Sequence, residues 1–247
     1  MSIRIERQGI LFWTEQAPED IIKKFLNKLE VKTIFEFGSY DSGDAIRYKE
    51  TYPNARVISF EGCPVRYSVI DSYKDKFGLE CYHYAVSDID GTIQFNQMQD
   101  PNEFSPNNPD KFGGSGSICK HTEEYKREFN HLVILNEPVT VNTTRIDTFC
   151  KKNKIDSIDI MHIDVEGAEH LVIHGFGKMR PKIVWAETHL DKKFYGETAY
   201  APGEVDALLV SMGYTFIYSD GYDRLYVHNI FQYPLSFLDM MQVEINY

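Results

Sequence analysis

The sequence has few features of secreted, membrane-spanning or nucleic-acid-binding proteins. Its 247 residues include only four cysteines, spaced 18, 38 and 31 positions apart, so neither the CxxC spacing of a zinc site nor a disulfide framework is present. No apolar run approaches the ~18 residues of a membrane span. The first residues also lack the small-residue cleavage site of a signal peptide. We therefore expect a cytoplasmic protein with reduced thiols and no membrane span.

Positive charge is scarce as well. Lysine and arginine number 26 against 37 aspartate and glutamate residues, which gives a net charge of −11. A protein that neutralises many phosphates needs the opposite balance, so long nucleic acid is a poor partner. Hydrophobic residues make up 43% of the chain, which is enough for a substantial core. The length suits one large α/β domain, and we expect residues 1–247 to form it.

Segments with strand and helix character alternate along most of the chain. Residues 33–37 and 56–60 predict strands around a glycine turn and a helix, which is a βαβ unit. Further strands are expected at 80–86, 92–97, 158–163, 182–187, 214–219 and 224–228. Turn sequences predict one hairpin between the first two of these and another between the last two. The pattern predicts a doubly wound, mostly parallel α/β sheet with helices on both faces and an antiparallel edge.

Three segments fall outside this alternation. Residues 1–32 predict an N-terminal extension with an amphipathic helix. Residues 97–131 carry three prolines and a Gly-Gly-Ser-Gly-Ser run, and a loop of this length is either a lid over a substrate or disordered. Residues 231–247 are rich in large apolar groups and predict either a packed tail or the seam of a homodimer.

The first glycine turn, EFGSYDSG at residues 36–43, is unsuited to phosphates. It lacks the Lys-Ser/Thr of a P-loop and the second glycine of the dinucleotide fingerprint. Glu61 ends the next strand, 23 positions after Gly38 and close to the ~20 typical of an acid that binds ribose hydroxyls. These features favour an adenosine ligand without pyrophosphate, and S-adenosylmethionine meets that description. Its cationic end is complemented by carboxylates, so we expect Glu36 and Asp41 to face it. A helix N-cap is an equally good role for Asp41.

A second group of charges lies in the stretch HIDVEGAEH at residues 162–170. Asp164 ends a buried strand and so reaches the carboxyl edge of the sheet, where open α/β sheets bind ligands. We expect Asp164 and Glu166 to face the cleft and Glu169 to stabilise the helix start. Glu187 and His189 end the adjacent predicted strand and can converge with Asp164.

Residues 139–189 resemble the FkbM family of S-adenosylmethionine-dependent methyltransferases. The matching pieces are TRIDTF, IDIMHIDVEGAEHLVIHG and a proline-led strand that ends in a glutamate with a histidine two places on. Upstream, IFEFGSYDSGD, FEGCP and AVSDIDGTIQF extend the likeness to about residue 33. This chain departs from the family at His162, where lysine is usual, and at Tyr40, where asparagine is usual.

The resemblance implies the seven-stranded class I methyltransferase variant of the Rossmann sheet, with an antiparallel last strand. It implies a hydroxyl acceptor on a sugar, a glycan or a glycosylated small molecule. Glu61 would bind the ribose, and Val86, Ser87 and Asp88 would lie near the adenine. The full set of cofactor contacts that we expect is Glu36, Gly38, Ser39, Tyr40, Asp41, Glu61, Gly62, Val86, Ser87, Asp88 and Asp164.

Methyl transfer to a hydroxyl requires an aligned acceptor and a group that takes its proton. The candidate catalytic residues are Asp164, Glu166, Glu187 and His189. Either His189 or a carboxylate of raised pKa would be the base. Alternatively, Asp164, Glu187 and His189 would hold a divalent ion that acidifies the hydroxyl. Two other classes stay open: a cofactor-binding domain without catalysis, and an NAD-linked reductase, for which the GxGxxG turn is missing.

Overall fold

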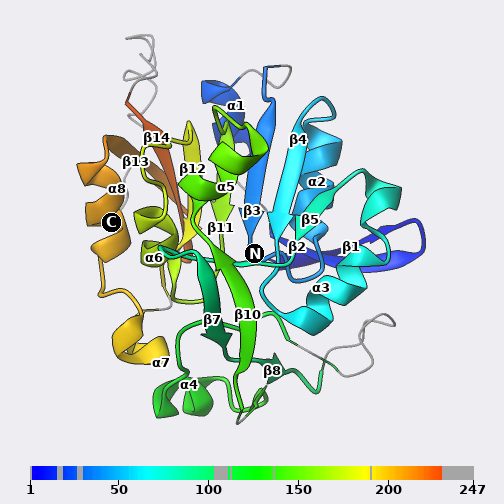
Figure 1. Ribbon diagram of the computed structural model, residues 1–247, viewed down its shortest axis with the longest axis vertical. Helices are drawn as coiled ribbons and strands as arrows, with labels where there is room; N and C mark the ends of the chain where they lie inside the picture. Colours follow the sequence, from blue (N-terminus) through cyan, green and yellow to red (C-terminus); the bar gives the residue numbers. More distant parts are fainter. Residues whose placement is uncertain are drawn as a thin grey trace.

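The computed structural model describes residues 2–15, 19–26, 30–102, 111, 113–135, 137–189 and 191–229. Its main sheet has seven strands in the order β13-β14-β12-β11-β3-β4-β5 (Figure 1). The parallel strands are β3 (Thr33–Phe37), β4 (Arg56–Phe60), β5 (Glu80–Tyr82), β11 (Ile160–Ile163) and β12 (Ile183–Glu187). The predicted class I methyltransferase fold is therefore confirmed.

The predicted antiparallel C-terminal strand is confirmed, and it lies one place inside the edge of the sheet. β14 (Asp223–His228) pairs antiparallel with both β12 and β13 (Tyr214–Ser219). The predicted C-terminal hairpin forms, but its second strand inserts between its first strand and β12. Edge strand β13 consequently runs parallel to β12.

Helices cover both faces of the main sheet, as predicted. Alternate strand residues point to opposite faces, so Phe35 and Phe37 join one core cluster and Ile34 joins the other. The first face is packed by α5 (Ile146–Asn153), α6 (Glu169–His174) and α8 (Glu204–Ser211). The second is packed by α1 (Glu19–Phe25), α2 (Gly43–Thr51) and α3 (Pro64–Asp71). The result is a three-layer domain with a sheet buried on both sides (Figure 1).

A second, smaller sheet shows that the predicted hairpin between residues 80–86 and 92–97 was wrong. Residues 80–86 form two strands, β5 in the main sheet and β6 (Ala85–Val86) in a second one. β7 (Gly91–Phe95) does not pair with β6, because β10 (Val139–Thr144) lies between them. Val141 of β10 packs with Ala85 and Phe95 in a separate apolar cluster, which favours this pairing over the predicted hairpin.

In the described part of the N-terminal extension, α1 is the only helix. Before it, β1 (Ser2–Arg7) and β2 (Ile10–Glu15) form an antiparallel hairpin that the sequence analysis missed. Gln8 and Gly9 connect the strands with φ angles of 52° and 78°, the left-handed backbone of a tight two-residue hairpin turn. Arg7 Nη2 donates a 2.9 Å hydrogen bond to Glu50 Oε2 and ties the hairpin to α2.

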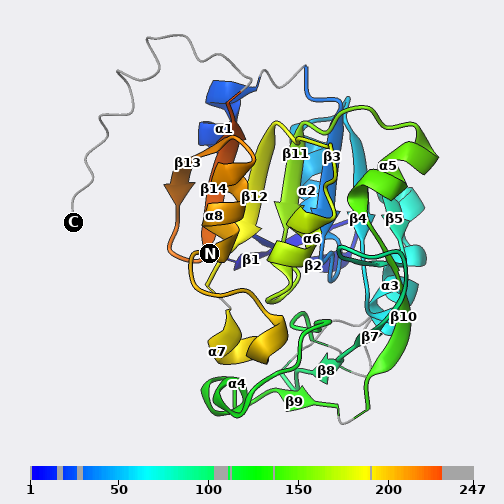
Figure 2. The ribbon, with the colours of Figure 1, turned by 60° about the vertical axis from the view of Figure 1, so that its left-hand side comes forward.

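The described residues of the segment 97–131 gather at one end of the main sheet, together with β7, β10 and α7 (Lys192–Tyr195) (Figure 2). Its described part contains β8 (Met98–Gln99), which pairs with β9 (Val133–Ile134), and α4 (Glu123–Glu128), which contacts α7. The role of a lid stays a prediction.

Three further expectations concern the ends, the thiols and the membrane. The predicted tail and dimer seam at 231–247 lie outside the described residues. All four cysteines are buried and unpaired, in agreement with the expected reduced thiols. Within the described ranges, no helix combines the length and apolar character required to cross a bilayer.

Candidate active site

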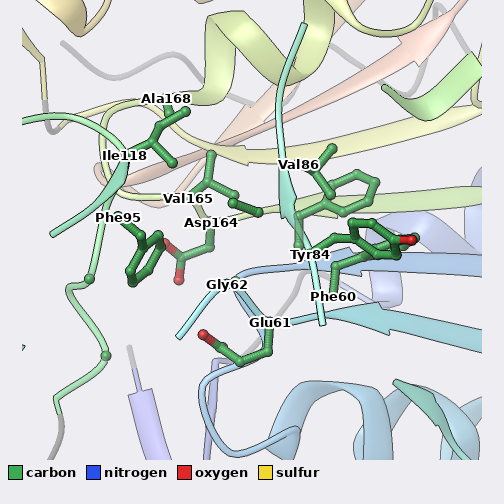
Figure 3. A pocket seen from close by; sticks show the side chains of 15 residues that line it. Phe60, Glu61, Gly62, Tyr84, Val86, Phe95, Ile118, Asp164, Val165 and Ala168 are labelled. Atoms are coloured by element: carbon green, nitrogen blue, oxygen red, sulfur yellow. The ribbon is translucent and has the colours of Figure 1, made fainter. Parts of the chain in front are cut away.

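A pocket opens where β3, β4 and β11 end, and its empty space is about 450 Å³. In Figure 3, Phe60, Tyr84 and Val86 gather at one end of this pocket and Phe95 and Ile118 at the other, with Asp164 and Glu61 between them. The lining residues are Phe37, Gly38, Phe60, Glu61, Gly62, Tyr84, Ala85, Val86, Phe95, Gly114, Gly116, Ile118, Asp164, Val165 and Ala168. The predicted contacts Gly38, Glu61, Gly62, Val86 and Asp164 therefore share one cavity.

Gly38 makes the close approach of two strand ends feasible. Its φ angle is +81°, and a Cβ atom at this position would lie 1.6 Å from the carbonyl oxygen of Asp164. The Asp164 N–H also donates to the Phe37 carbonyl at 3.0 Å. Because only glycine fits here, this turn fixes the position of Asp164 at the pocket wall.

The turn after β3 does not offer its amide groups to a ligand. The N–H groups of Gly38 and Ser39 both donate to the Phe60 carbonyl at 3.1 Å. The Tyr40 N–H donates to Glu61 Oε2 at 2.7 Å. A phosphate-binding loop needs such N–H groups free to point at the anion. The geometry therefore agrees with a ligand that lacks pyrophosphate.

Glu61 presents a buried carboxylate to the pocket. Only 5% of the residue is exposed, and besides Tyr40 it accepts a 2.7 Å hydrogen bond from the Cys63 N–H. Burial raises the pKa of Glu61 to about 7. Each carboxylate oxygen has two lone pairs, so both can still accept hydroxyl groups from a ribose.

Two predicted cofactor contacts take structural roles instead. Glu36 does not line the pocket, contrary to prediction, because it lies on the sheet face that packs against α2. Its carboxylate accepts a hydrogen bond from the Ser39 hydroxyl, and burial raises its pKa well above the usual range. Asp41 Oδ1 accepts a 3.0 Å bond from the N–H of Gly43, the first residue of α2, but the N-cap residue of this helix is Ser42 and not Asp41.

Of the three residues predicted near the adenine, only Val86, the last residue of β6, lines the pocket, and the following Ser87 and Asp88 do not. The Ser87 hydroxyl lies 3.0 Å from the hydroxyl of Thr143, and the Asp88 carbonyl accepts a 2.7 Å bond from Arg145 Nη1. Ser87 and Asp88 therefore hold the second sheet in place beside the pocket.

The four candidate catalytic residues do converge. Asp164, Glu166 and Glu187 have carboxylate oxygens within 4.8 Å of one another, and we call these three the edge cluster. His189 Nδ1 lies 3.4 Å from Glu187 Oε1. His189 is not a member of the three-carboxylate group, so the group that best fits a metal ion differs from the predicted one. Burial and the nearby Asp164 raise the pKa of Glu187 well above its ordinary value.

The turn that carries Glu166 is held from two sides. Glu166 has a φ of 57°, a left-handed conformation that is costly for a residue with a Cβ atom. The Tyr195 hydroxyl donates to its carboxylate, and the Ser117 hydroxyl donates to its carbonyl at 2.7 Å. Residues of α7 and of the 97–131 segment thus stabilise the strained turn.

Glu169 stabilises the same turn from the helix side, as predicted. It is fully buried, and its Oε1 accepts the N–H groups of Val165 at 3.0 Å and Gly167 at 3.3 Å. Burial raises its pKa to about 8.

His162 points away from the pocket. It lies on the α2 face of β11 beside Glu36 and Asp44, with which it forms a group within 4.8 Å that we call the inner cluster. Its ring centroid is 6.1 Å from that of Tyr48 in an edge-to-face arrangement. Burial lowers the pKa of His162 to about 4, so the ring is neutral.

The sequence analysis missed the aromatic and apolar lining of the pocket. Phe60 directly precedes Glu61, which is a usable signal, but Tyr84 and Phe95 carry none. For Gly116 the glycine-rich run was a usable signal. Glycine is required there, because a Cβ atom would lie 2.8 Å from the Phe95 ring.

The strand order of the main sheet is that of a class I methyltransferase domain. The chain belongs to the FkbM family: the family model described as Methyltransferase FkbM domain matches residues 37–216. It is similar to the 2-O-methyltransferase NoeI of Sinorhizobium fredii, with 30% identity over 153 residues. This match covers 58% of the chain and 56% of NoeI, so the chain spans little more than half of that relative.

Solved structures give more distant similarities. A precorrin-6y C5,15-methyltransferase from Geobacter metallireducens has a TM-score of 0.40 and 10% identity, with 84% of this chain and 87% of that chain covered. A putative caffeoyl-CoA O-methyltransferase from Staphylococcus aureus has a TM-score of 0.43 and 11% identity, with coverages of 87% and 83%. At these values neither substrate transfers to this chain.

Proposed function

We propose that this protein transfers a methyl group from S-adenosylmethionine to a hydroxyl of a sugar, a glycan or a glycosylated small molecule. One observation carries the proposal: Asp164 belongs both to the cofactor pocket and to the edge cluster. An acceptor bound by the cluster therefore lies next to the cofactor. The name of NoeI, a 2-O-methyltransferase, supports a hydroxyl acceptor.

The pocket residues fit this cofactor. Phe60, Tyr84 and Val86 offer apolar surface to an adenine ring, and Glu61 offers acceptors to ribose hydroxyls (Figure 3). The Asp164 carboxylate complements a cationic sulfur. When bound, S-adenosylmethionine supplies an electrophilic methyl group on a sulfonium that is already a good leaving group.

The edge cluster orients the acceptor and receives its proton. Carboxylates accept hydrogen bonds from hydroxyl pairs, so Asp164 and Glu187 bind neighbouring hydroxyls of a sugar ring. Burial lowers the pKa of His189, and the neutral imidazole takes the proton of the reacting hydroxyl. A positive charge on His189 favours the ionised form of Glu187, whose Oε1 lies 3.4 Å from His189 Nδ1, so the two groups stabilise each other after the proton has moved.

A metal ion is the second candidate for activating the hydroxyl. Three carboxylates within 4.8 Å are typical ligands of hard divalent cations. Dialysis against EDTA, followed by addition of Mg²⁺ or Mn²⁺, separates the two mechanisms. The histidine mechanism predicts unchanged turnover after EDTA, and loss with recovery on metal addition would replace it by the metal mechanism.

The proposal is tested by S-adenosylhomocysteine release with a panel of methyl glycosides and glycosylated natural products. We expect S-adenosylhomocysteine release with at least one acceptor. In Asp164→Asn this release should be suppressed about 100-fold or more. Each active acceptor is compared with its deoxy analogue to identify the methylated hydroxyl. Cofactor binding without turnover across the panel would instead indicate a non-catalytic domain.

A further inference from the structure

A second hollow adjoins the cofactor pocket and contains a buried cation. Its empty space, open solvent included, is about 230 Å³, and it shares Glu61, Phe95, Gly114 and Gly116 with the pocket. Arg66 and Tyr40 also line it. Because the two cavities share a wall, a ligand in the pocket can extend a group into the hollow.

Arg66 is 1% exposed, and its hydrogen bonding is incomplete. Its Nε donates to the Tyr40 carbonyl at 3.0 Å, while Nη1 has no hydrogen-bond partner. The nearby Glu61 carboxylate attracts this cation, but its oxygens accept the backbone N–H groups of Tyr40 and Cys63 and form no hydrogen bond with Arg66 Nη1. A buried guanidinium with an unsatisfied N–H is costly unless an acceptor arrives.

Tyr40 supports the guanidinium at a cost in backbone strain. Its φ is 50°, in the left-handed region that asparagine, the usual family residue here, adopts more easily. The Arg66 guanidinium lies 4.0 Å from the centroid of the Tyr40 ring, a cation–π contact. A Cβ on Gly114 would lie 3.4 Å from this ring, so the glycine run at 113–117 packs closely against Tyr40. Strain of this kind persists where the surroundings require it.

We propose that the hollow is an anion subsite in which Arg66 binds a carboxylate or phosphate carried by a ligand of the cleft. This inference rests on the proposed function. Guanidinium groups form charge-assisted, often bidentate bonds with these anions. In a chain of net charge −11, an anionic ligand needs such local positive charge. The anion belongs either to the amino-acid end of the cofactor or to an acidic acceptor.

Arg66→Met tests the subsite, and Arg56→Met is the matched control. Arg56 begins β4 at the end opposite Glu61 and forms a half-exposed ion pair with Glu80. Calorimetry measures binding of S-adenosylhomocysteine and of 5′-methylthioadenosine, which lacks the amino-acid end. The protein is then saturated with S-adenosylhomocysteine, and calorimetry measures the binding of methyl glucuronide, glucose 6-phosphate and neutral methyl glucoside.

The expected result is a loss of at least tenfold for one anionic probe, with less than twofold change for its neutral counterpart. Loss for S-adenosylhomocysteine alone assigns the anion to the cofactor, and loss for a sugar acid or sugar phosphate assigns it to the acceptor. Arg66→Lys keeps the positive charge but lacks the planar guanidinium. If Arg66→Met does not fold, the affinities of Arg66→Lys for the charged and the neutral probes are compared instead. Equal effects on charged and neutral probes would overturn the subsite. Failure of the wild type to bind S-adenosylhomocysteine would instead refute the proposed function.

Discussion

The inner and edge clusters use the same kinds of residue in opposite ways. The inner cluster of Glu36, Asp44 and His162 is enclosed between the sheet and α2, whereas the edge cluster of Asp164, Glu166 and Glu187 lies where the strands end. His162 and Asp164 are only two positions apart. The difference shows that position relative to a strand end, and not residue type, decides which charges reach the ligand.

The electrostatics of the two clusters differ accordingly. In the inner cluster, Asp44 pairs with Arg47 at 3.0 Å, Glu36 has a raised pKa, and His162 is neutral. A lysine at position 162 would add a buried cation between the acids, and the histidine avoids that charge. In the edge cluster, repulsion from neighbouring acids contributes to the raised pKa of Glu187. These differences support the proposal that the edge cluster does the chemistry, with the inner cluster serving the fold.

The largest expected effect comes from Gly38→Ala, which separates the strand ends that both clusters depend on. Its Cβ would overlap the Asp164 carbonyl, so we expect loss of cofactor binding and a fall in stability greater than the ~1–2 kcal/mol of left-handed backbone alone. Thermal unfolding and S-adenosylhomocysteine titration measure these effects. Gly203→Ala is the control, because Gly203 has a φ of 78° and no atoms near its Cβ position. Similar losses in both variants would contradict the steric argument.

Glu187→Gln and Glu36→Gln test directly whether the edge cluster and the inner cluster have different roles. We expect Glu187→Gln to lower turnover about 100-fold, since an acceptor contact and a partner of His189 are lost. Its melting temperature should not fall, because the amide replaces a buried carboxyl whose charged form is disfavoured by burial and by the neighbouring acids. Glu36→Gln should keep turnover and cofactor affinity within about threefold and change only stability. If Glu36→Gln reduced turnover as much as Glu187→Gln, the assignment of roles would be wrong.

A smaller effect is expected for Glu61→Gln. Ribose hydroxyls bind the ionised carboxylate better than the amide, so affinity for S-adenosylhomocysteine should fall about tenfold at pH 8. With a pKa of about 7 in the free protein, Glu61 is mostly protonated at pH 6. Wild-type affinity should therefore weaken from pH 8 to pH 6, and the variant should show a flat profile. Calorimetry at both pH values checks this, and parallel profiles would exclude Glu61 from the contact.

His162→Gln should leave turnover unchanged and affect only the pH dependence of stability. The folded pKa of about 4 lies below the unfolded value of 6.5, so the unfolded chain binds the proton more tightly. The wild type should therefore lose stability relative to the variant as pH falls from 6.5 toward 4, by about 3 kcal/mol at the lower end. Urea unfolding of both proteins at pH 4.5 and pH 7 measures this difference. An equal pH response in both would mean that His162 is not buried in neutral form.

Sequence patterns predicted what depends on local order along the chain. The strands that end at Phe37, Phe60 and Ile163 were found because each is a short apolar run followed by a turn, and Asp164 and Glu61 follow directly. Glu36 was misplaced because side-chain direction depends on pairing with β11 and packing under α2. The partners of β6 and β7 could not be foreseen, since β10 lies more than 40 residues further along the chain. Pairing over such distances leaves no local signal.

The placement of β14 has a consequence for synthesis and folding. β12, which carries Glu187, finds its second partner only when residues 223–227 pair with it. Until the ribosome has released that strand, one side of β12 is an open hydrogen-bonding edge next to an apolar core, a surface that invites wrong pairing. The main sheet therefore cannot close during translation of its parallel strands. Nascent chains stalled before residue 223 should depend strongly on chaperones, and those stalled after β14 has left the exit tunnel should not.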